Sequence, residues 1–598
     1  MCGICGELRL DGNRPDPDLL QRMTDRLARR GPDSAGHWQD GPLAFGHRRL
    51  AIIDLSARSN QPMLDAAAGL AIVFNGTIYN YRELRAELQG RGHTFASSGD
   101  TEVILKAYAE WGERCVERLI GMFAFAIRNL RTQELFLARD RLGIKPLYYA
   151  RTPAAFRFAS NVQALLEAAD IDTGVDPVAL HFQLTLHAVV PAPRTVLAGV
   201  RKLPPATTLT ILADGRERQQ TYWTLAAARP VMARSDDEWL EAVHERLLTA
   251  VRRRMDVADV PVGVLLSGGL DSSLLVALLA EAGKEKLLTF SVGFEDQPEE
   301  KGSEFEYSDQ VVARYATDHH KFLIPNGEVL KRLPEAVTCM AEPMVGQDAV
   351  AFFLLSEQVS KHVKVVQSGQ GADEVFAGYF WYPQMAAAEG EDSLARFASR
   401  YFDRDHAEFL QAVEPHWHGA DHSSEHIRRL LEAPGADTYL DRVLRMDVTT
   451  LIVDDPVKRV DNMTMAWGLE ARVPFLDHEL VELAMQVPPA LKLAEGGKGI
   501  LKRLARGRIP DGVIDRPKGY FPVPALKYVR GEFLDFMHGV LDTPAARARG
   551  VFRREYLDTL FAAPEAWMTR LQGSKLWHAA LFELWFQLNV DPVRGSRS

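Results

Sequence analysis

The second residue of the chain carries the most distinctive chemistry in the sequence. The chain begins Met1-Cys2-Gly3, and removal of the initiator Met would make Cys2 the terminal residue. A terminal Cys combines a thiol with an α-amine whose ordinary pKa is about 7.7–8.0, so the amine can accept the thiol proton. We therefore interpret Cys2 as a nucleophile that carries its own general base, suited to attack on an amide such as that of a glutamine side chain.

Cys2 also belongs to a C-x-x-C pair with Cys5, which is typical of redox sites and of zinc half-sites. The two remaining cysteines, Cys115 and Cys339, do not form a second pair, which disfavours a four-cysteine zinc site. A redox pair is expected where a strand meets a helix inside a βαβ unit, not at the second residue. Taken alone, the start of the chain leaves the nucleophile and these alternatives open.

A loop rich in glycine and serine lies near the middle of the chain. The apolar run 262–266 predicts a strand, the loop reads S-G-G-L-D-S-S over 267–273, and a helix-like stretch 274–280 precedes a strand-like stretch 287–292. This order is that of a nucleotide-binding βαβ unit, in which backbone N–H groups and a helix N-terminus bind phosphates. Asp271 in this loop is a candidate Mg²⁺ ligand. The loop lacks G-K-[ST], so transfer of a γ-phosphoryl group is not implied.

A second segment repeats this design, because the strand-like run 363–367 leads into S-G-Q-G-A-D-E over 368–374. In a parallel sheet, loops of this kind meet at the carboxyl ends of the strands, where ligands bind. We therefore predict that Asp271 and Asp373 hold one Mg²⁺ on a pyrophosphate group. The alternative is that Asp373 and Glu374 only favour the N-terminus of a helix.

Composition limits the class of protein. A chain of 598 residues with 46% hydrophobic and 25% charged residues predicts two or more globular domains. The net charge of −10 argues against a broad nucleic-acid surface. No apolar run is long enough to span a bilayer, and four cysteines without regular spacing favour a reducing compartment, so we expect a soluble cytoplasmic protein.

Several segments must position these groups. We predict a strand over 70–74 that ends at the turn Asn75-Gly76, a helix over 81–89, and a hairpin formed by 121–127 and 135–138. The proline-rich and polar stretch 190–235 is predicted to contain the linker between domains.

Three further motifs favour structural roles. Arg252-Arg253-Arg254 is expected to be a solvated helix end, and the pair His319-His320 is expected to point to opposite faces of a strand. Asp454-Asp455, which precedes a proline, is expected to cap a helix.

These motifs, in this order, resemble those of the glutamine-dependent asparagine synthetases from end to end. The first half is similar to a class II glutamine amidotransferase domain, with matches at 2–4, 30–33, 49–54, 75–76, 99–102 and 139–143. The second half is similar to the synthetase domain of that family, with matches at 267–273, 368–379 and 469–477. The resemblance implies an α/β fold class, with an Ntn-hydrolase α/β/β/α sandwich over 2–215 and an adenine-nucleotide α-hydrolase-like (Rossmann-like) parallel sheet with helices over 235–590.

The resemblance also implies roles for residues of the first half. Cys2 would be the glutaminase nucleophile, Arg49 would bind the glutamine carboxylate, and Asp100 would bind its α-amine. Asn75 and the backbone N–H of Gly76 would form the oxyanion hole.

In the second half the resemblance implies an ATP site. The residues implied for pyrophosphate are Ser267, Gly268, Gly269, Asp271, Ser272 and Ser273, and those for adenosine are Leu265, Val292, Ser368 and Gly369. Asp271 and Asp373 would hold Mg²⁺. Lys498 would lie near the phosphates, its alternative being a lysine on the surface of a helix.

The implied reaction has two stages and uses small-molecule substrates: glutamine, ATP and a carboxylate acceptor. Glutamine is hydrolysed through a thioester, and the acceptor carboxylate attacks the α-phosphate of ATP to give an acyl-adenylate and pyrophosphate. Ammonia then travels inside the protein and displaces AMP, which yields an amide. Neither a nucleic-acid nor a membrane partner is implied, and a homodimer is possible.

Two positions depart from the usual asparagine synthetase pattern. Thr77 replaces the glutamate of N-G-E-I-Y-N, and Gln370 replaces the acidic residue of S-G-E-G. Gln370 cannot act as a base, although the acidic residue in its place is associated with adenylate formation. The pattern looks more like the bacterial N-acetylglutaminylglutamine amidotransferase branch, which makes a compatible solute that acts as an osmoprotectant; asparagine synthesis is the alternative.

Two other classes of protein fit less well. An RNA-modifying PP-loop ATPase is expected to have a basic face and a cysteine near the ATP loop, whereas Cys339 lies outside both loops. A sensor of glutamine or nucleotide without catalytic activity would not need the candidate nucleophile, oxyanion hole and metal ligands.

Overall fold

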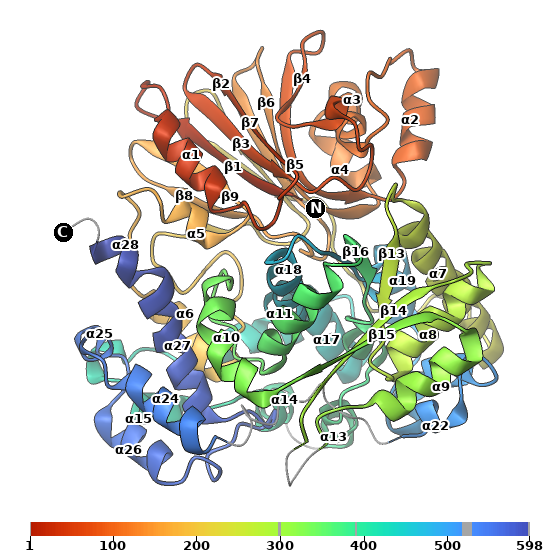
Figure 1. Ribbon diagram of the computed structural model, residues 1–598, viewed down its shortest axis with the longest axis vertical. Helices are drawn as coiled ribbons and strands as arrows, with labels where there is room; N and C mark the ends of the chain where they lie inside the picture. The colour runs from red at the N-terminus through yellow and green to blue at the C-terminus, as the bar shows by residue number, and fades with distance from the viewer. Residues whose placement is uncertain (1, 297–300, 389–391, 517–528, 596–598) are drawn as a thin grey trace.

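The computed structural model describes residues 2–296, 301–388, 392–516 and 529–595. The first third of the chain forms a layered β-rich body that lies above a larger, mostly helical body containing a parallel sheet (Figure 1). This mixed α/β architecture confirms the predicted fold class. Among the described residues, no helix is both long enough and apolar enough to cross a membrane.

The first body contains two antiparallel six-stranded sheets, with strand orders β10-β8-β9-β1-β3-β2 and β12-β11-β7-β6-β5-β4. The strands of the first sheet are β1 (Gly3–Arg9), β2 (Ser34–Asp40), β3 (Leu43–Arg49), β8 (Tyr148–Arg151), β9 (Ala155–Ala159) and β10 (Arg201–Lys202). Those of the second are β4 (Met63–Asp65), β5 (Leu70–Ile78), β6 (Gly121–Asn129), β7 (Glu134–Arg139), β11 (Thr207–Ile211) and β12 (Glu217–Thr221).

The faces of the two sheets that look toward each other bury one hydrophobic core. Alternate residues of both sheets contribute to it, such as Ile4 and Phe45 from one and Val73 and Leu137 from the other. Helix α1 (Pro17–Asp25) packs on β1 and β3, and helix α3 (Asp100–Trp111) packs on β5, so helices cover the outer faces. The result is the α/β/β/α sandwich that the sequence predicts.

Two expectations for this body hold and two need correction. Helix α2 (Tyr81–Gly90) and the β6–β7 hairpin are confirmed. The strand predicted over 70–74 does not end at Asn75-Gly76, because β5 continues to Ile78 and Asn75 pairs with Ala124. Gly76 allows this close pairing, since a Cβ there would lie 2.2 Å from the carbonyl oxygen of Met122.

The predicted linker region 190–235 contains three strands of the first body, β10, β11 and β12, before the stretch 222–235 that leads into helix α7 (Asp236–Asp256). Its polar part forms β12, whose residues 217–221 pair with β11 across a turn, so the second sheet extends to Thr221. Exposed polar strands carry no hydrophobic alternation, and this strand is exposed at all five positions. The sequence pattern therefore did not reveal it.

The second body is built on a five-stranded parallel sheet with the order β15-β14-β13-β16-β17. Its strands are β13 (Val262–Leu265), β14 (Leu288–Phe294), β15 (Asp318–Ile324), β16 (Val365–Gln367) and β17 (Glu470–Arg472). The strand order reverses direction at β13, which has β14 on one side and β16 on the other. The loops after β13 and β16 therefore meet at a topological switch point, where open α/β sheets bind ligands.

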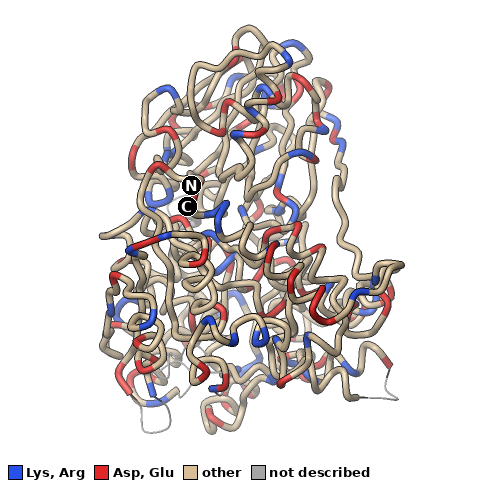
Figure 2. The backbone as a smooth tube through the Cα atoms, turned by 90° about the vertical axis from the view of Figure 1, so that its right-hand side faces the viewer, with Lys and Arg blue, Asp and Glu red and all other residues tan. Residues whose placement is uncertain are grey.

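Helices surround this sheet. The ones used below are α6 (Pro177–Thr185), α7 (Asp236–Asp256), α8 (Leu270–Glu281), α11 (Asp348–Val359), α12 (Ala372–Phe376), α15 (His406–Ala412), α16 (His422–Glu432), α17 (Tyr439–Met446), α18 (Lys458–Met465), α21 (Gly499–Ala505) and α27 (Lys575–Asn589). Between α17 and α18 the chain forms two π-helical turns, η4 (Asp447–Leu451) and η5 (Val453–Val457). Acidic and basic residues are interspersed in both bodies (Figure 2).

The three structural motifs have mixed outcomes. His319 and His320 lie on β15, where His319 Nδ1 contacts Thr289 Oγ1 and His320 stacks on Phe290, as a structural pair would. Arg254 is not solvated: it is buried in α7 and its Nη1 lies 2.9 Å from Asp477 Oδ2.

Asp454 and Asp455 do not cap a helix, because they lie inside the π-helical turn η5. Each makes a charge pair instead, Asp454 with Lys202 at 2.6 Å and Asp455 with Arg459. The pair Asp454–Lys202 links the second body to β10 of the first body.

Candidate active sites

The first candidate site surrounds Cys2 at the start of β1. Cys2 is buried, and its backbone N–H donates to Asn75 Oδ1 at 3.0 Å. Burial raises the pKa of the Cys2 thiol above its ordinary value, although charges nearby, including Arg49, lower it in part. The thiol is therefore protonated at neutral pH and needs a base to become a nucleophile.

Asn75 presents its amide to the same region. Its Nδ2 is fully buried, and no acceptor among the described residues reaches it. A buried amide donor without a partner is costly in a folded protein, unless a ligand supplies the acceptor. An oxyanion bound beside Asn75 could supply that acceptor.

Arg49 is the last residue of β3 and lies beside this region. The loop 54–60 holds its side chain by hydrogen bonds that the sequence did not predict. Its guanidinium donates to the carbonyl oxygens of Ser56 (2.8 Å) and Asp54 and to Asn60 Oδ1 (2.8 Å). Asp54 in turn accepts hydrogen bonds from Ser59 Oγ and from the backbone N–H of Ser98. These contacts fix the direction of the guanidinium before any substrate binds.

Asp100 is the first residue of α3, and its Oδ2 accepts a hydrogen bond from the N–H of Ile78 at 3.0 Å. Burial raises the pKa of Asp100 to about 6. The carboxylate is charged at neutral pH and can attract an ammonium group.

Thr77, the position that departs from the family pattern, contacts a residue of the other body. Its Oγ1 donates to Glu470 Oε1 at 3.2 Å, and Glu470 belongs to β17 of the parallel sheet. Despite burial, which alone would raise it, the pKa of Glu470 is lowered to about 2 by positive charges that include Arg472 and Lys145. A carboxylate from the second body therefore reaches the strand that carries Asn75.

Other buried charges also cross between the bodies. Arg30 Nη1 lies 2.8 Å from Asp461 Oδ2, and Lys145 Nζ lies 3.2 Å from Asp461 Oδ1. Arg30 also donates to the carbonyl oxygen of Cys2. The candidate nucleophile is thus connected through one arginine to α18 of the synthetase body.

The second candidate site is a cavity of about 670 Å³ at the carboxyl ends of β13, β14 and β16. Most residues that the sequence assigns to ATP, the metal or adenylation line it: Leu265, Ser267, Gly269, Asp271, Ser272, Val292, Ser368, Gly369, Gln370, Asp373 and Lys498. Gly268 and Ser273 do not. Gly268 has φ +74°, and a Cβ there would lie 2.8 Å from the backbone nitrogen of Ser308, so its role is to shape the loop.

Lys498 bridges the two candidate metal ligands. Its Nζ lies 2.6 Å from Asp271 Oδ2 and 2.8 Å from Asp373 Oδ1. Although burial lowers it, the two carboxylates raise the pKa of Lys498 above its ordinary value, so the ammonium stays charged. The two acidic residues come from different strand ends and already share one cation, a donor set that also fits Mg²⁺.

Sequence reasoning missed the far wall of this cavity. Asp447 and Asp455 come from the π-helical turns, whose i to i+5 spacing leaves no helical periodicity to read. Glu374 accepts a hydrogen bond from Tyr379 Oη at 2.7 Å, and burial, with Asp373 adding to it, raises the pKa of Glu374 to about 7. Burial likewise raises the pKa of Asp447 well above its ordinary range.

Two family models match this chain, one in each half. The glutamine amidotransferase domain profile matches residues 1–223, and the asparagine synthase profile matches residues 242–587. The chain belongs to the asparagine synthase family. It is therefore a glutamine-dependent amidotransferase of the ligase class, and ATP is a substrate of this family.

Similar relatives span the whole chain. Asparagine synthetase [glutamine-hydrolyzing] 1 of Bacillus subtilis is 31% identical over 99% of this chain and 97% of its own length. A putative asparagine synthetase of Mycobacterium tuberculosis is 32% identical over 99% and 98%. Amidase chry2 of Gibberella zeae is 28% identical over 88% and 89%, so similar chains bear names other than asparagine synthetase.

Proposed function

We propose that this enzyme uses Cys2 to release ammonia from glutamine for amidation of a carboxylate in the synthetase cavity. Cys2 attacks the side-chain amide carbon, ammonia leaves, and water hydrolyses the thioester to glutamate. Asn75 Nδ2 and the Gly76 N–H stabilise the oxyanion, while Arg49 binds the α-carboxylate and Asp100 the α-ammonium group. The unpartnered, buried Nδ2 of Asn75 is the observation that supports this assignment most directly.

In the second stage ATP lies along the carboxyl ends of the strands, with its phosphates at the loop 267–273. The acceptor carboxylate attacks the α-phosphate, pyrophosphate leaves, and ammonia then displaces AMP from the acyl-adenylate. Lys498 offers positive charge to the phosphates, and Asp271 and Asp373 would hold Mg²⁺, which neutralises phosphate charge when bound. The shared contact of both carboxylates with Lys498 supports this arrangement.

We further propose that the acceptor is the C-terminal carboxylate of N-acetylglutaminylglutamine, which serves as an osmoprotectant precursor. The observation that carries this proposal is Gln370, an uncharged side chain that lines the cavity where relatives of the usual pattern have an acidic residue. An acetylated dipeptide has no α-ammonium group, so its site needs amide contacts more than charges. Gln370 can donate and accept such hydrogen bonds.

The charges of the cavity wall also favour the acetylated dipeptide over aspartate as the acceptor. Arg459 is paired with Asp348 at 3.0 Å and with Asp455, while burial raises the pKa of Glu374 to about 7 and the pKa of Asp447 well above its ordinary value. Aspartate would bring an additional ammonium and an additional carboxylate into this wall. A peptide with a single carboxylate disturbs fewer of these pairs.

The decisive experiment measures pyrophosphate release with a panel of acceptors at saturating glutamine and ATP. We expect turnover with N-acetylglutaminylglutamine and at least about a hundredfold lower kcat/KM with aspartate, a difference of about 2.7 kcal/mol. The dipeptide without its acetyl group is the matched control for the absent ammonium. Strong turnover with aspartate and none with the acetylated dipeptide would assign the enzyme to asparagine synthesis.

The proposal includes the organisation and the setting of the enzyme. We propose a glutaminase domain over 2–215, extended by β12 to about residue 221, and a synthetase domain over 235–590. We also propose a cytoplasmic enzyme that can act as a homodimer. Size-exclusion chromatography with light scattering tests the last point.

A further inference from the structure

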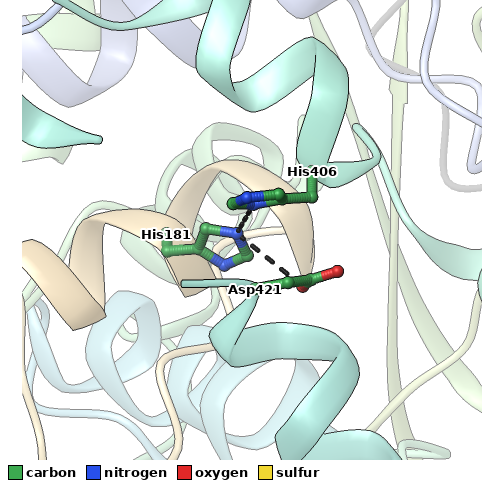
Figure 3. A group of neighbouring side chains, drawn as sticks. All are labelled: His181, His406 and Asp421. Carbon is green, nitrogen blue, oxygen red and sulfur yellow. Dashed lines mark hydrogen bonds and ion pairs between the residues drawn. The ribbon is translucent and has the colours of Figure 1, made fainter. Parts of the chain in front are cut away.

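A cluster of two histidines and an aspartate lies away from both candidate sites, where α6 packs against α15 and α16. His181 extends from α6, His406 is the first residue of α15, and Asp421 immediately precedes α16 (Figure 3). His181 Nε2 lies 3.1 Å from His406 Nδ1 and 3.8 Å from Asp421 Oδ1. One atom of each residue therefore lies within 4.8 Å of the others.

The hydrogen bonds behind His181 determine which of its ring nitrogens carries the proton. Thr185 Oγ1 donates to the carbonyl oxygen of His181 at 2.7 Å, which uses its only proton. Ser423 Oγ, 2.6 Å from Thr185 Oγ1, must then be the donor in that contact. Ser423 Oγ can consequently only accept from His181 Nδ1, 2.9 Å away, so Nδ1 is protonated.

This tautomer leaves an unprotonated lone pair on His181 Nε2, directed toward the cluster. A carboxylate oxygen of Asp421 faces the same point, and two acceptors repel each other unless a cation or a proton lies between them. A neutral imidazole whose other nitrogen is held by a hydrogen bond is the form in which histidine binds metals.

We propose that His181 Nε2, His406 Nδ1 and a carboxylate oxygen of Asp421 form a Zn²⁺ site. Zinc binds histidine nitrogen and carboxylate oxygen at about 2.0–2.2 Å, which places the ligand atoms of a tetrahedral site about 3.4 Å apart. The separations of 3.1 and 3.8 Å bracket that value. Two nitrogen donors and one oxygen donor favour zinc over Mg²⁺ or Ca²⁺, and water completes the fourth position.

The position of this site defines its role. His181 lies on α6, which comes between β9 and β10 of the glutaminase sandwich in the chain, whereas His406 begins α15 and Asp421 precedes α16 in the synthetase body. Bound zinc would join α6 to a segment of the second body that is more than 200 residues away in the chain. Asp421 is about one third exposed, so the ion can enter from solvent. The site is therefore structural, a clamp between the two parts of the enzyme.

The test measures zinc binding to full-length protein without an affinity tag, after removal of metals with EDTA. We expect about one zinc per chain by elemental analysis, with an affinity that competition against a chromophoric chelator resolves. His406→Ala and Asp421→Asn each remove one ligand and should weaken binding at least about a hundredfold, since loss of a supporting residue alone costs 10–100-fold. Zinc should raise the melting temperature of the unsubstituted protein and leave that of Asp421→Asn unchanged.

Two controls separate this site from other histidines. His422→Ala removes a ring that contacts His181 edge-on but offers no ligand atom, and it should keep the zinc. His187→Gln changes the other group of this kind, His187, Asp403 and His578, and should also keep it. Absence of zinc binding by the full-length protein overturns the proposal. Retention of zinc by both Asp421→Asn and His406→Ala also overturns it. Loss of zinc only in His187→Gln would assign the binding to the other group and overturn the proposal as well.

The supporting hydroxyl offers a second measurement that does not depend on removing a ligand. Ser423→Ala leaves all three ligand atoms in place but removes the acceptor that fixes the His181 tautomer. We expect zinc affinity to fall about tenfold or more. Unchanged affinity would contradict the argument from the tautomer.

Discussion

The glutaminase site and the synthetase site hold their side chains by different means. Around Cys2, the groups are fixed by backbone hydrogen bonds, such as those that Arg49 donates to loop carbonyl oxygens and the one that Asp100 accepts from the Ile78 N–H. Around the ATP loop, they are held by charge, with Lys498 between Asp271 and Asp373. We therefore expect the first site to keep its internal contacts when substrate binds, and the second to exchange its internal ion pairs for those of a charged substrate.

This difference follows from the reactions that we propose. An oxyanion is a small charge that a rigid pair of donors can stabilise. A triphosphate brings several negative charges, and a site prepared for it must balance its own charges when empty. A substitution in the first site should consequently affect only the step that uses the replaced group. A substitution in the second site should affect activity by changing the balance of charges.

The largest effect is expected from Cys2→Ala. Removal of the nucleophile should lower glutamine-driven amide synthesis by at least about a thousandfold, because no other group supplies the thioester. Synthesis driven by added ammonium salt should continue, since the synthetase cavity is unchanged. Cys5→Ala, which removes a buried thiol that contacts Thr24, is the control and should keep glutamine-driven synthesis. Equal loss with glutamine and with ammonia would contradict the separation of the two sites.

The next effect tests the charged site. Lys498→Met leaves the carboxylates of Asp271 and Asp373 facing each other without their shared cation, and it removes positive charge from the phosphates. We expect ATP–pyrophosphate exchange to fall by about a hundredfold or more. Glutaminase activity should stay within a few-fold of normal. Lys361→Met, an exposed lysine after α11, is the control for loss of one charge; an equal fall of exchange in that variant would show that Lys498 has no special role.

A tenfold effect is expected from pH. Because burial raises the pKa of Asp100 to about 6, this carboxylate is protonated below pH 6 and loses its attraction for the α-ammonium group of glutamine. The kcat/KM for glutamine should therefore fall about tenfold per pH unit below 6, whereas an aspartate of ordinary pKa would hold until about pH 4. Ammonia-driven synthesis, corrected for the free ammonia present, provides the reference. In Asp100→Asn the kcat/KM for glutamine should be low at every pH, and a persisting drop at pH 6 would assign it to another group.

The smallest effect concerns the contact between the sites. Thr77→Val removes the hydroxyl that donates to Glu470 and should lower the free energy of unfolding by about 1 kcal/mol. The amount of amide formed per glutamine hydrolysed should fall less than tenfold, while ammonia-driven synthesis stays constant. Thr77→Ser keeps the hydroxyl and should behave as the unsubstituted protein. An equal free energy of unfolding for all three proteins would show that this hydrogen bond does not contribute to stability.

Much of the architecture could be predicted because the decisive signals are local. The loops after 262–266 and 363–367 were predicted to meet at one edge of a sheet, and both line the same cavity. Hydrophobic runs identified β5, β6, β7 and β13 for the same reason. Exposed β12 carries no such signal and was assigned to a linker.

Contacts between residues far apart in the chain could not be predicted from the sequence. Lys498 reaches Asp271 across 227 positions, and it does so from a left-handed backbone conformation (φ +55°) just before α21. The π-helical turns displace Asp454 and Asp455 from the cap positions that the following proline suggests. The burial of Arg254 depends on Asp477, which comes from another element 223 positions away.

The hydrogen bond between Thr77 and Glu470 has a practical consequence for protein engineering. If the synthetase half of this chain were joined to the glutaminase half of a relative with glutamate at the position of Thr77, that glutamate would face the buried carboxylate of Glu470 across the seam of the chimera. Halves from this family should therefore be exchanged only together with the residue type at position 77, and a library of hybrids sorted by that single position would separate productive from unproductive fusions.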